Sequence, residues 1–89
     1  MKEKFQEYMT NIISATCGFS PTLEVNEPYP GTIQIWIAGT PEERAAVMGK
    51  EGKTISAFNR LATIFAKRNR CYQYLYVKRK EPALENKTN

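Results

Sequence analysis

The sequence predicts one small α+β domain, and two kinds of periodicity support this class. Apolar residues recur at the three- and four-residue spacing of an amphipathic helix in three segments, and they alternate with polar residues, as in a half-buried strand, in three others. The predicted helices cover 2–17, 41–48 and 54–67. The predicted strands cover 22–26, 32–37 and 71–78.

Length and composition limit the number of domains. The chain has 89 residues, of which 42% are apolar, and this is enough for one modest core. We therefore expect a single domain over 1–80 and a polar, flexible tail over 81–89.

The predicted helices have recognisable ends and apolar sides. Gly18 ends the first helix, and Thr40, Pro41 and Glu43 begin the second with a capping box and a proline at the first helical position. The residues expected to face the core are Phe5, Met9, Ile12, Ile13 and Thr16, then Ala45, Ala46, Val47 and Met48, then Ile55, Phe58, Leu61, Ala62 and Phe65. A basic stripe is expected on the opposite side of the third helix, formed by Lys53, Arg60 and Lys67.

The predicted strands also have two distinct faces. The alternation of Ile33, Ile35 and Ile37 with polar residues indicates the best-packed strand, and 28–31 before it is expected to be a connecting loop because it holds two prolines and a glycine. In the last strand we expect Leu75 and Val77 to face the helices. The aromatic residues expected on the open face of the sheet are Trp36, Tyr72, Tyr74 and Tyr76.

Charge is distributed unevenly along the chain, whose net charge is +4. Two lysines and six glutamates give 1–43 a net charge of −4, whereas ten basic residues and one glutamate give 44–80 a net charge of +9. Clustered positive charge attracts polyanions, which favours a nucleic acid or an acidic surface as partner. A merely solvated basic surface is the alternative.

Several function classes are not favoured. The chain has no histidine, and Cys17 and Cys71 lack the paired spacing of a metal site, so we expect no metal and two free thiols, each either a small core side chain or half-buried. No long apolar run or signal-peptide pattern is present, so we expect a cytoplasmic protein without a membrane span. The carboxylates are isolated on polar faces, so neither an enzyme nor a bound cofactor is expected.

The most specific motif is a short loop in the basic half of the chain. Gly49 and Gly52 bracket a charged pair, and glycines at both positions permit a sharp turn whose exposed amides can receive a phosphate. Although 52–54 matches the tail of a nucleotide-binding P-loop, Val47 stands where that loop requires its first glycine, and a helix is predicted where it requires a strand. An ordinary helix-turn-helix connection is the other interpretation.

With its flanking residues, this loop resembles the signature of KH domains, Val-Ile-Gly-x-x-Gly-x-x-Ile. The sequence here is Val47-Met48-Gly49-Lys50-Glu51-Gly52-Lys53-Thr54-Ile55, with Met48 in place of isoleucine. The predicted order of helix, strand, strand, helix, loop, helix and strand over 2–78 is similar to a type II KH domain and to small stand-alone bacterial KH-domain RNA-binding proteins. The resemblance implies a three-stranded mixed sheet with helices on one face and single-stranded RNA held between the loop and the second strand. It also implies a heterodimer with another KH protein of the Jag type, whereas the three alternating tyrosines of the last strand suggest a homodimer.

Two hypotheses of function follow. The leading one is a non-catalytic protein, of the RNA chaperone or post-transcriptional regulator type, that clamps single-stranded RNA by its backbone. Its expected RNA-binding residues are Arg44, Met48, Gly49, Lys50, Glu51, Gly52, Lys53, Thr54 and Arg60. Ala45, Met48 and Ile35 or Ile37 could form an apolar floor for bases, although core packing alone is the favoured role of the two isoleucines. The alternative is a protein-protein assembly module whose interface is the aromatic open face of the sheet, although tyrosines also suit a solvated sheet.

Overall fold

The computed structural model describes residues 1–78. Its elements are α1 (Lys2–Cys17), β1 (Leu23–Tyr29), β2 (Thr32–Ile37), α2 (Pro41–Met48), the 3-10 turn η1 (Lys50–Gly52), α3 (Lys53–Arg68) and β3 (Tyr72–Val77). Within these residues there are three α-helices and one three-stranded mixed sheet, so the predicted α+β class is confirmed. The tail predicted for 81–89 lies outside the described residues.

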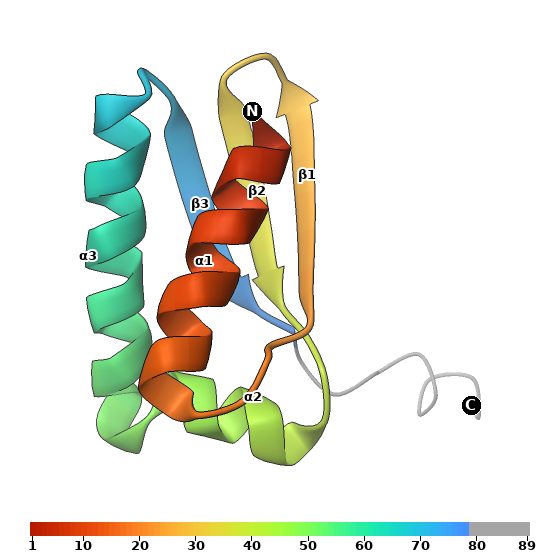
Figure 1. Ribbon diagram of the computed structural model, residues 1–89, viewed down its shortest axis with the longest axis vertical. Coiled ribbons are helices and arrows are strands. Elements are labelled where there is room, and N and C mark those ends of the chain that lie inside the picture. The colour runs from red at the N-terminus through yellow and green to blue at the C-terminus, as the bar shows by residue number, and fades with distance from the viewer. Residues whose placement is uncertain (79–89) are drawn as a thin grey trace, which may run out of the picture.

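The sheet has β2 at its centre, with β1 antiparallel on one side and β3 parallel on the other. Parallel neighbours cannot be joined by a tight turn, so α2 and α3 form the crossover from β2 to β3. Figure 1 shows α1 and α3 side by side across one face of the sheet, with α2 at one end of the molecule. The other face of the sheet carries no helix within the described part of the chain.

The core lies between the sheet and the helices. Its buried members are Phe5, Met9, Ile13, Val25, Ile33, Ile35, Ile37, Val47, Phe58, Ala62 and Ala66. The three isoleucines of β2 are at most 1% exposed, which confirms the prediction that this strand is the best packed. Phe65 joins α3 to α1, because its ring packs edge-on against Phe5 and face to face with Tyr8, with centroid separations of 4.9 and 4.1 Å.

The predicted helix ends are confirmed. Gly18 adopts the left-handed conformation after α1, and its amide donates to the carbonyl of Ser14. At the start of α2, the Thr40 hydroxyl accepts the Glu43 amide at 3.1 Å, and the Glu43 carboxylate accepts the Thr40 amide at 3.0 Å. These two reciprocal bonds satisfy amides that would otherwise lack partners at the helix N-terminus.

The predicted loop over 28–31 is wrong, because Pro28 and Tyr29 belong to β1 and only two residues form the turn to β2. A proline is tolerated here because β1 is an edge strand and its register shifts between Asn26 and Tyr29. The Glu27 carboxylate also accepts the amide of Gly31 at 3.0 Å, which closes the turn.

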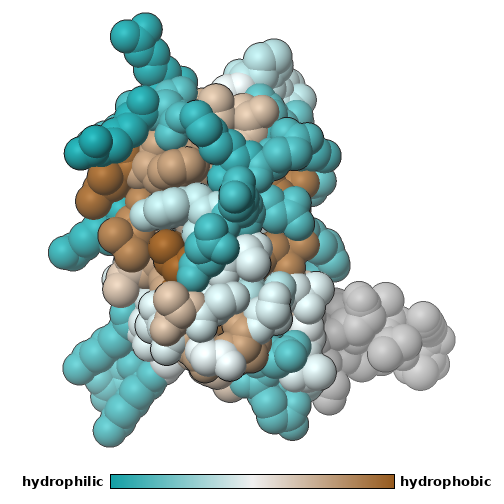
Figure 2. Space-filling view, in the orientation of Figure 1, coloured by the Kyte–Doolittle hydropathy of each residue, from teal (hydrophilic) through white to brown (hydrophobic). Residues whose placement is uncertain are grey.

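Four residues expected in the core are instead exposed: Thr16, Ala45, Ala46 and Leu61. On α3 the buried positions Phe58, Ala62 and Ala66 form a narrow stripe, and Leu61 lies about 100° around the helix from Ala62. Leu61 and Ile64 therefore remain 40% and 47% exposed. Apolar side chains reach the surface on the α3 side of the molecule in Figure 2.

Candidate functional site

The loop between α2 and α3 is a tight turn that depends on glycine. Gly49 has φ 78° and ψ 171°, a region that is essentially restricted to glycine, and its carbonyl accepts the Gly52 amide at 3.1 Å. A Cβ at Gly49 would collide with the Thr54 side chain and lie 3.0 Å from the Thr54 backbone nitrogen. Gly52 is also left-handed, at φ 72°, but a Cβ there would meet nothing within 4 Å. The chain therefore passes the start of α3 at a distance that only glycine permits at position 49.

Glu51 is a second unusual residue of this turn, with φ 58° and ψ 26°. This is the left-handed region, which costs about 1 to 2 kcal/mol for a residue with a Cβ. The conformation turns the chain sharply between Lys50 and Gly52 and leaves both flanking lysine side chains exposed.

The N-terminus of α3 is directly behind the loop. Gly52 occupies the N-cap position and has no side chain that could accept a hydrogen bond from a backbone amide of the first turn. This first turn of α3 also contains no acidic residue. The first-turn amides and the positive end of the helix dipole therefore have no side-chain cap or acidic partner within their own helix. This arrangement suits a phosphate or another anion.

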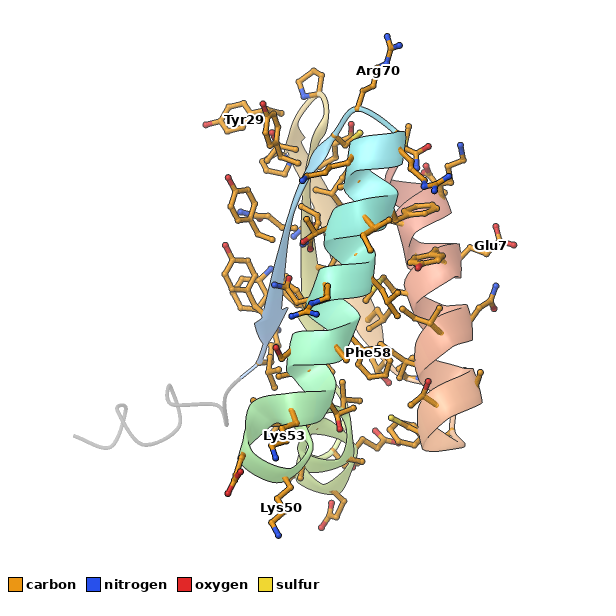
Figure 3. The ribbon with its side chains drawn as sticks, turned by 90° about the vertical axis from the view of Figure 1, so that its left-hand side faces the viewer. Glu7, Tyr29, Lys50, Lys53, Phe58 and Arg70 are labelled. Carbon is orange, nitrogen blue, oxygen red and sulfur yellow. The ribbon has the colours of Figure 1, made fainter. Side chains whose placement is uncertain are left out.

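Two lysines add charge at the same end of the molecule. Figure 3 shows Lys50 and Lys53 together at this end, while Arg70 lies at the opposite end. Lys53 lies 3.8 Å from the Glu51 carboxylate, but both side chains are at least 70% exposed, so this pair is weak. Lys50 forms no ion pair within residues 1–78. The loop therefore presents at least one unpaired cation despite the acid beside it.

Next to the loop lies an open groove with a volume of about 1080 Å³. Its apolar lining comes from α2, α3 and β3, through Met48, Ile55, Leu75 and Val77. Arg44 stands at the rim, where its guanidinium donates to the Gly39 carbonyl at 2.7 Å. The groove therefore combines apolar side chains with Arg44 and with the Glu24–Lys78 ion pair, next to the turn.

The structure brings most of the predicted RNA-binding residues together. Arg44 and Met48 line the groove, and 49–54 form the turn and the start of α3. Arg60 shares a shallow hollow on α3 with Lys53 and does not line the groove. The basic stripe of Lys53, Arg60 and Lys67 is thus exposed as predicted, but none of its residues lines the groove.

The apolar floor considered for Ala45 and for Ile35 or Ile37 is wrong, whereas the favoured core role of the two isoleucines is confirmed. Ile35 and Ile37 are fully buried under the helices, and Ala45 is exposed on α2 outside the groove. Ile55, Leu75 and Val77 take their place in the lining. Alternation in the sequence placed Leu75 and Val77 on the helix side of β3. The structure adds that β3 is an edge strand and that both residues line the groove.

The aromatic residues lie on the open face of the sheet, as predicted. Tyr72, Tyr74 and Tyr76 are 73%, 50% and 37% exposed. Trp36 stacks on Tyr76 with ring centroids 4.4 Å apart and planes inclined by 24°.

Other reactive groups are few. Cys17 and Cys71 are free and half-buried, as expected, and burial raises the pKa of the Cys17 thiol. Among residues 1–78 no group of three potential ligand side chains could hold a metal ion. In the same part of the chain no helix combines the length and apolar character needed to cross a membrane.

Comparison of the chain with known protein families, with curated protein sequences and with solved structures found no match in any of the three.

Proposed function

We propose that this chain is a non-catalytic single-stranded RNA-binding protein of type II KH-like architecture. The observation that carries the proposal is the turn at 49–52, which places two glycines of positive φ, two lysines and the uncapped N-terminus of α3 beside an apolar groove. The position of this turn between α2 and α3, before the last strand, supports the proposal. Phosphate contacts supply most of the affinity of such proteins, while splayed bases occupy an apolar surface.

In the proposed complex the RNA backbone contacts the turn and the start of α3, and the bases contact the groove. The backbone amides around Gly52 and the first turn of α3 receive a phosphate, and Lys50 and Lys53 neutralise its neighbours. Unstacked bases lie in the groove against Met48 and Leu75. Duplex RNA keeps its bases stacked and paired, so it should bind more weakly than a single strand of the same length.

Binding should weaken steeply as salt rises, because phosphates supply most of the proposed contacts. With about three to five neutralised phosphates, log K against log salt should have a slope of roughly −2 to −3.5 for a single strand. Fluorescence anisotropy of a short unstructured RNA across a salt series measures this slope. An affinity that does not change with salt would contradict the electrostatic part of the clamp.

Glu51→Gln should raise RNA affinity by about two- to fivefold at low salt, because it removes a negative charge beside the phosphates and frees Lys53 from its ion pair. The backbone at position 51 stays left-handed and the side chain keeps its size. The matched control is Glu7→Gln, which makes the same charge change on the outer side of α1. Equal effects of the two substitutions would show that only net charge matters and that the loop has no special role.

A further inference from the structure

The open face of the sheet is organised in rows across the three strands. One row holds Glu24, Trp36 and Tyr76, and the next holds Asn26, Gln34 and Tyr74. A third row holds Tyr29, Thr32 and Tyr72. Each row therefore places a tyrosine of the edge strand β3 beside a side chain of β2.

The first row shows what fits beside these tyrosines. There the Trp36 indole stacks on Tyr76, so a flat ring lies above β2. In the other two rows β2 carries Gln34 and Thr32, and within residues 1–78 no aromatic ring stacks on Tyr74 or Tyr72. These two tyrosines are also the more exposed ones, at 50% and 73%. A flat ring of a ligand can therefore stack on Tyr74 or Tyr72 in the way that the Trp36 indole stacks on Tyr76.

The chemistry of the rows suits nucleobases. Every base has a ring face that stacks on an aromatic side chain, and its edge hydrogen-bonds to amides and hydroxyls such as those of Gln34 and Thr32. Successive tyrosines on the strand are about 6.6 Å apart, roughly twice the 3.4 Å rise of stacked bases, so each ring suits one unstacked base.

The charge of the face also permits a polyanion. Glu24 is the acidic residue of these rows, and Lys78 neutralises it at 3.1 Å. The remaining side chains of the rows are uncharged. In the second row the amide side chains of Asn26 and Gln34 lie beside Tyr74, so polar groups interrupt the apolar surface that would favour a protein partner.

The face is continuous with the groove. The lining of the groove beside the loop includes Trp36 and Tyr76, which belong to the first row. It also includes Lys78, which forms the ion pair with Glu24 of that row. A strand that leaves the groove at the ends of β2 and β3 therefore meets the Trp36–Tyr76 stack first and then Tyr74.

We propose that the open sheet face is a second RNA-binding surface, on which unstacked bases of a strand leaving the groove stack against Tyr74 and Tyr72. The inference rests on the proposed function, because it extends the same RNA past the Gly-x-x-Gly clamp. The clamp then fixes the backbone, and the sheet face binds additional bases.

The test compares two RNAs on one pair of variants. An RNA of about four nucleotides fills a Gly-x-x-Gly groove, whereas one of about ten nucleotides also reaches the sheet face. Tyr72→Ala/Tyr74→Ala removes two exposed rings that do not line the groove. It should weaken the longer RNA about tenfold or more and leave the shorter RNA unchanged. Tyr72→Phe/Tyr74→Phe keeps the rings and should bind both RNAs as the unmodified protein does.

The possible failures are distinguishable. If the unmodified protein binds neither RNA, the proposed function fails and the inference fails with it. If it binds both but the alanine variant loses nothing on the longer RNA, or loses equally on both, the sheet-face inference is overturned while the clamp stands. If the alanine variant instead dissolves a dimer seen by sedimentation, with the longer RNA bound as before, the face is a protein interface and the inference is overturned.

Discussion

Gly49→Ala should lower the free energy of unfolding by about 2 to 5 kcal/mol, for two reasons that add at the same residue. The backbone angles of Gly49 lie in a region that is essentially closed to residues with a Cβ. The new methyl would also collide with Thr54, whose short side chain and backbone nitrogen are fixed in the first turn of α3 and cannot move aside. Urea denaturation followed by circular dichroism measures the loss.

Two other glycines provide matched controls for the Gly49 substitution. Gly52 and Gly31 have φ of 72° and 83°, but a Cβ at either would meet nothing within 4 Å. Their alanine variants should therefore lose only about 1 to 2 kcal/mol, the cost of the left-handed conformation. If all three variants lose the same free energy of unfolding, a methyl group at position 49 does not collide with Thr54, and the close approach of the loop to α3 is contradicted.

Local chemistry made much of the fold predictable. The capping box at Thr40 and the αL glycine at position 18 depend on residues within one helical turn, so they could be identified without tertiary contacts. The alternation in β2 and β3 likewise assigned the sides of Leu75 and Tyr74 correctly, because strand side chains point to opposite faces in turn.

The errors arose where the outcome depends on which elements are neighbours. Pro28 could be placed in a strand only after the strand order made β1 an edge. Leu61 belongs to the apolar pattern of α3, but the narrow packing side through Ala62 leaves it at the surface. Helical periodicity specifies a broad apolar side and does not show how much of it the partner elements cover.

The loop of the candidate site could be predicted from the sequence, whereas the groove beside it could not. Gly49 and Gly52 form the turn within four residues, so the motif itself specified it. The groove lining joins Met48 to Ile55 across the loop and to Leu75 on a strand 27 positions away in sequence. That arrangement follows from the parallel pairing of β2 and β3, which no local pattern encodes.

Lys50→Asp should weaken binding of single-stranded RNA by roughly ten- to a hundredfold, which corresponds to about 1 to 3 kcal/mol. The change removes a cation that forms no ion pair in the described residues and, together with Glu51, places two negative charges where the phosphates should lie. Both glycines and their backbone angles are unchanged. The exposed loop position should alter stability by less than about 0.5 kcal/mol, so lost binding could not be attributed to unfolding. Fluorescence anisotropy on a short unstructured RNA measures the affinity, and circular dichroism checks the fold.

The control for this experiment is Lys2→Asp, which changes the net charge by the same amount. Lys2 is exposed in the first turn of α1, at the opposite end of the molecule from α2 and the loop. A Debye length of about 8 Å at physiological salt screens that position from RNA bound at the loop, so the affinity should change little. A folded Lys50→Asp protein with unchanged affinity would overturn the clamp, because the phosphates would then bind elsewhere. Equal losses in both variants would instead show that total charge alone governs binding.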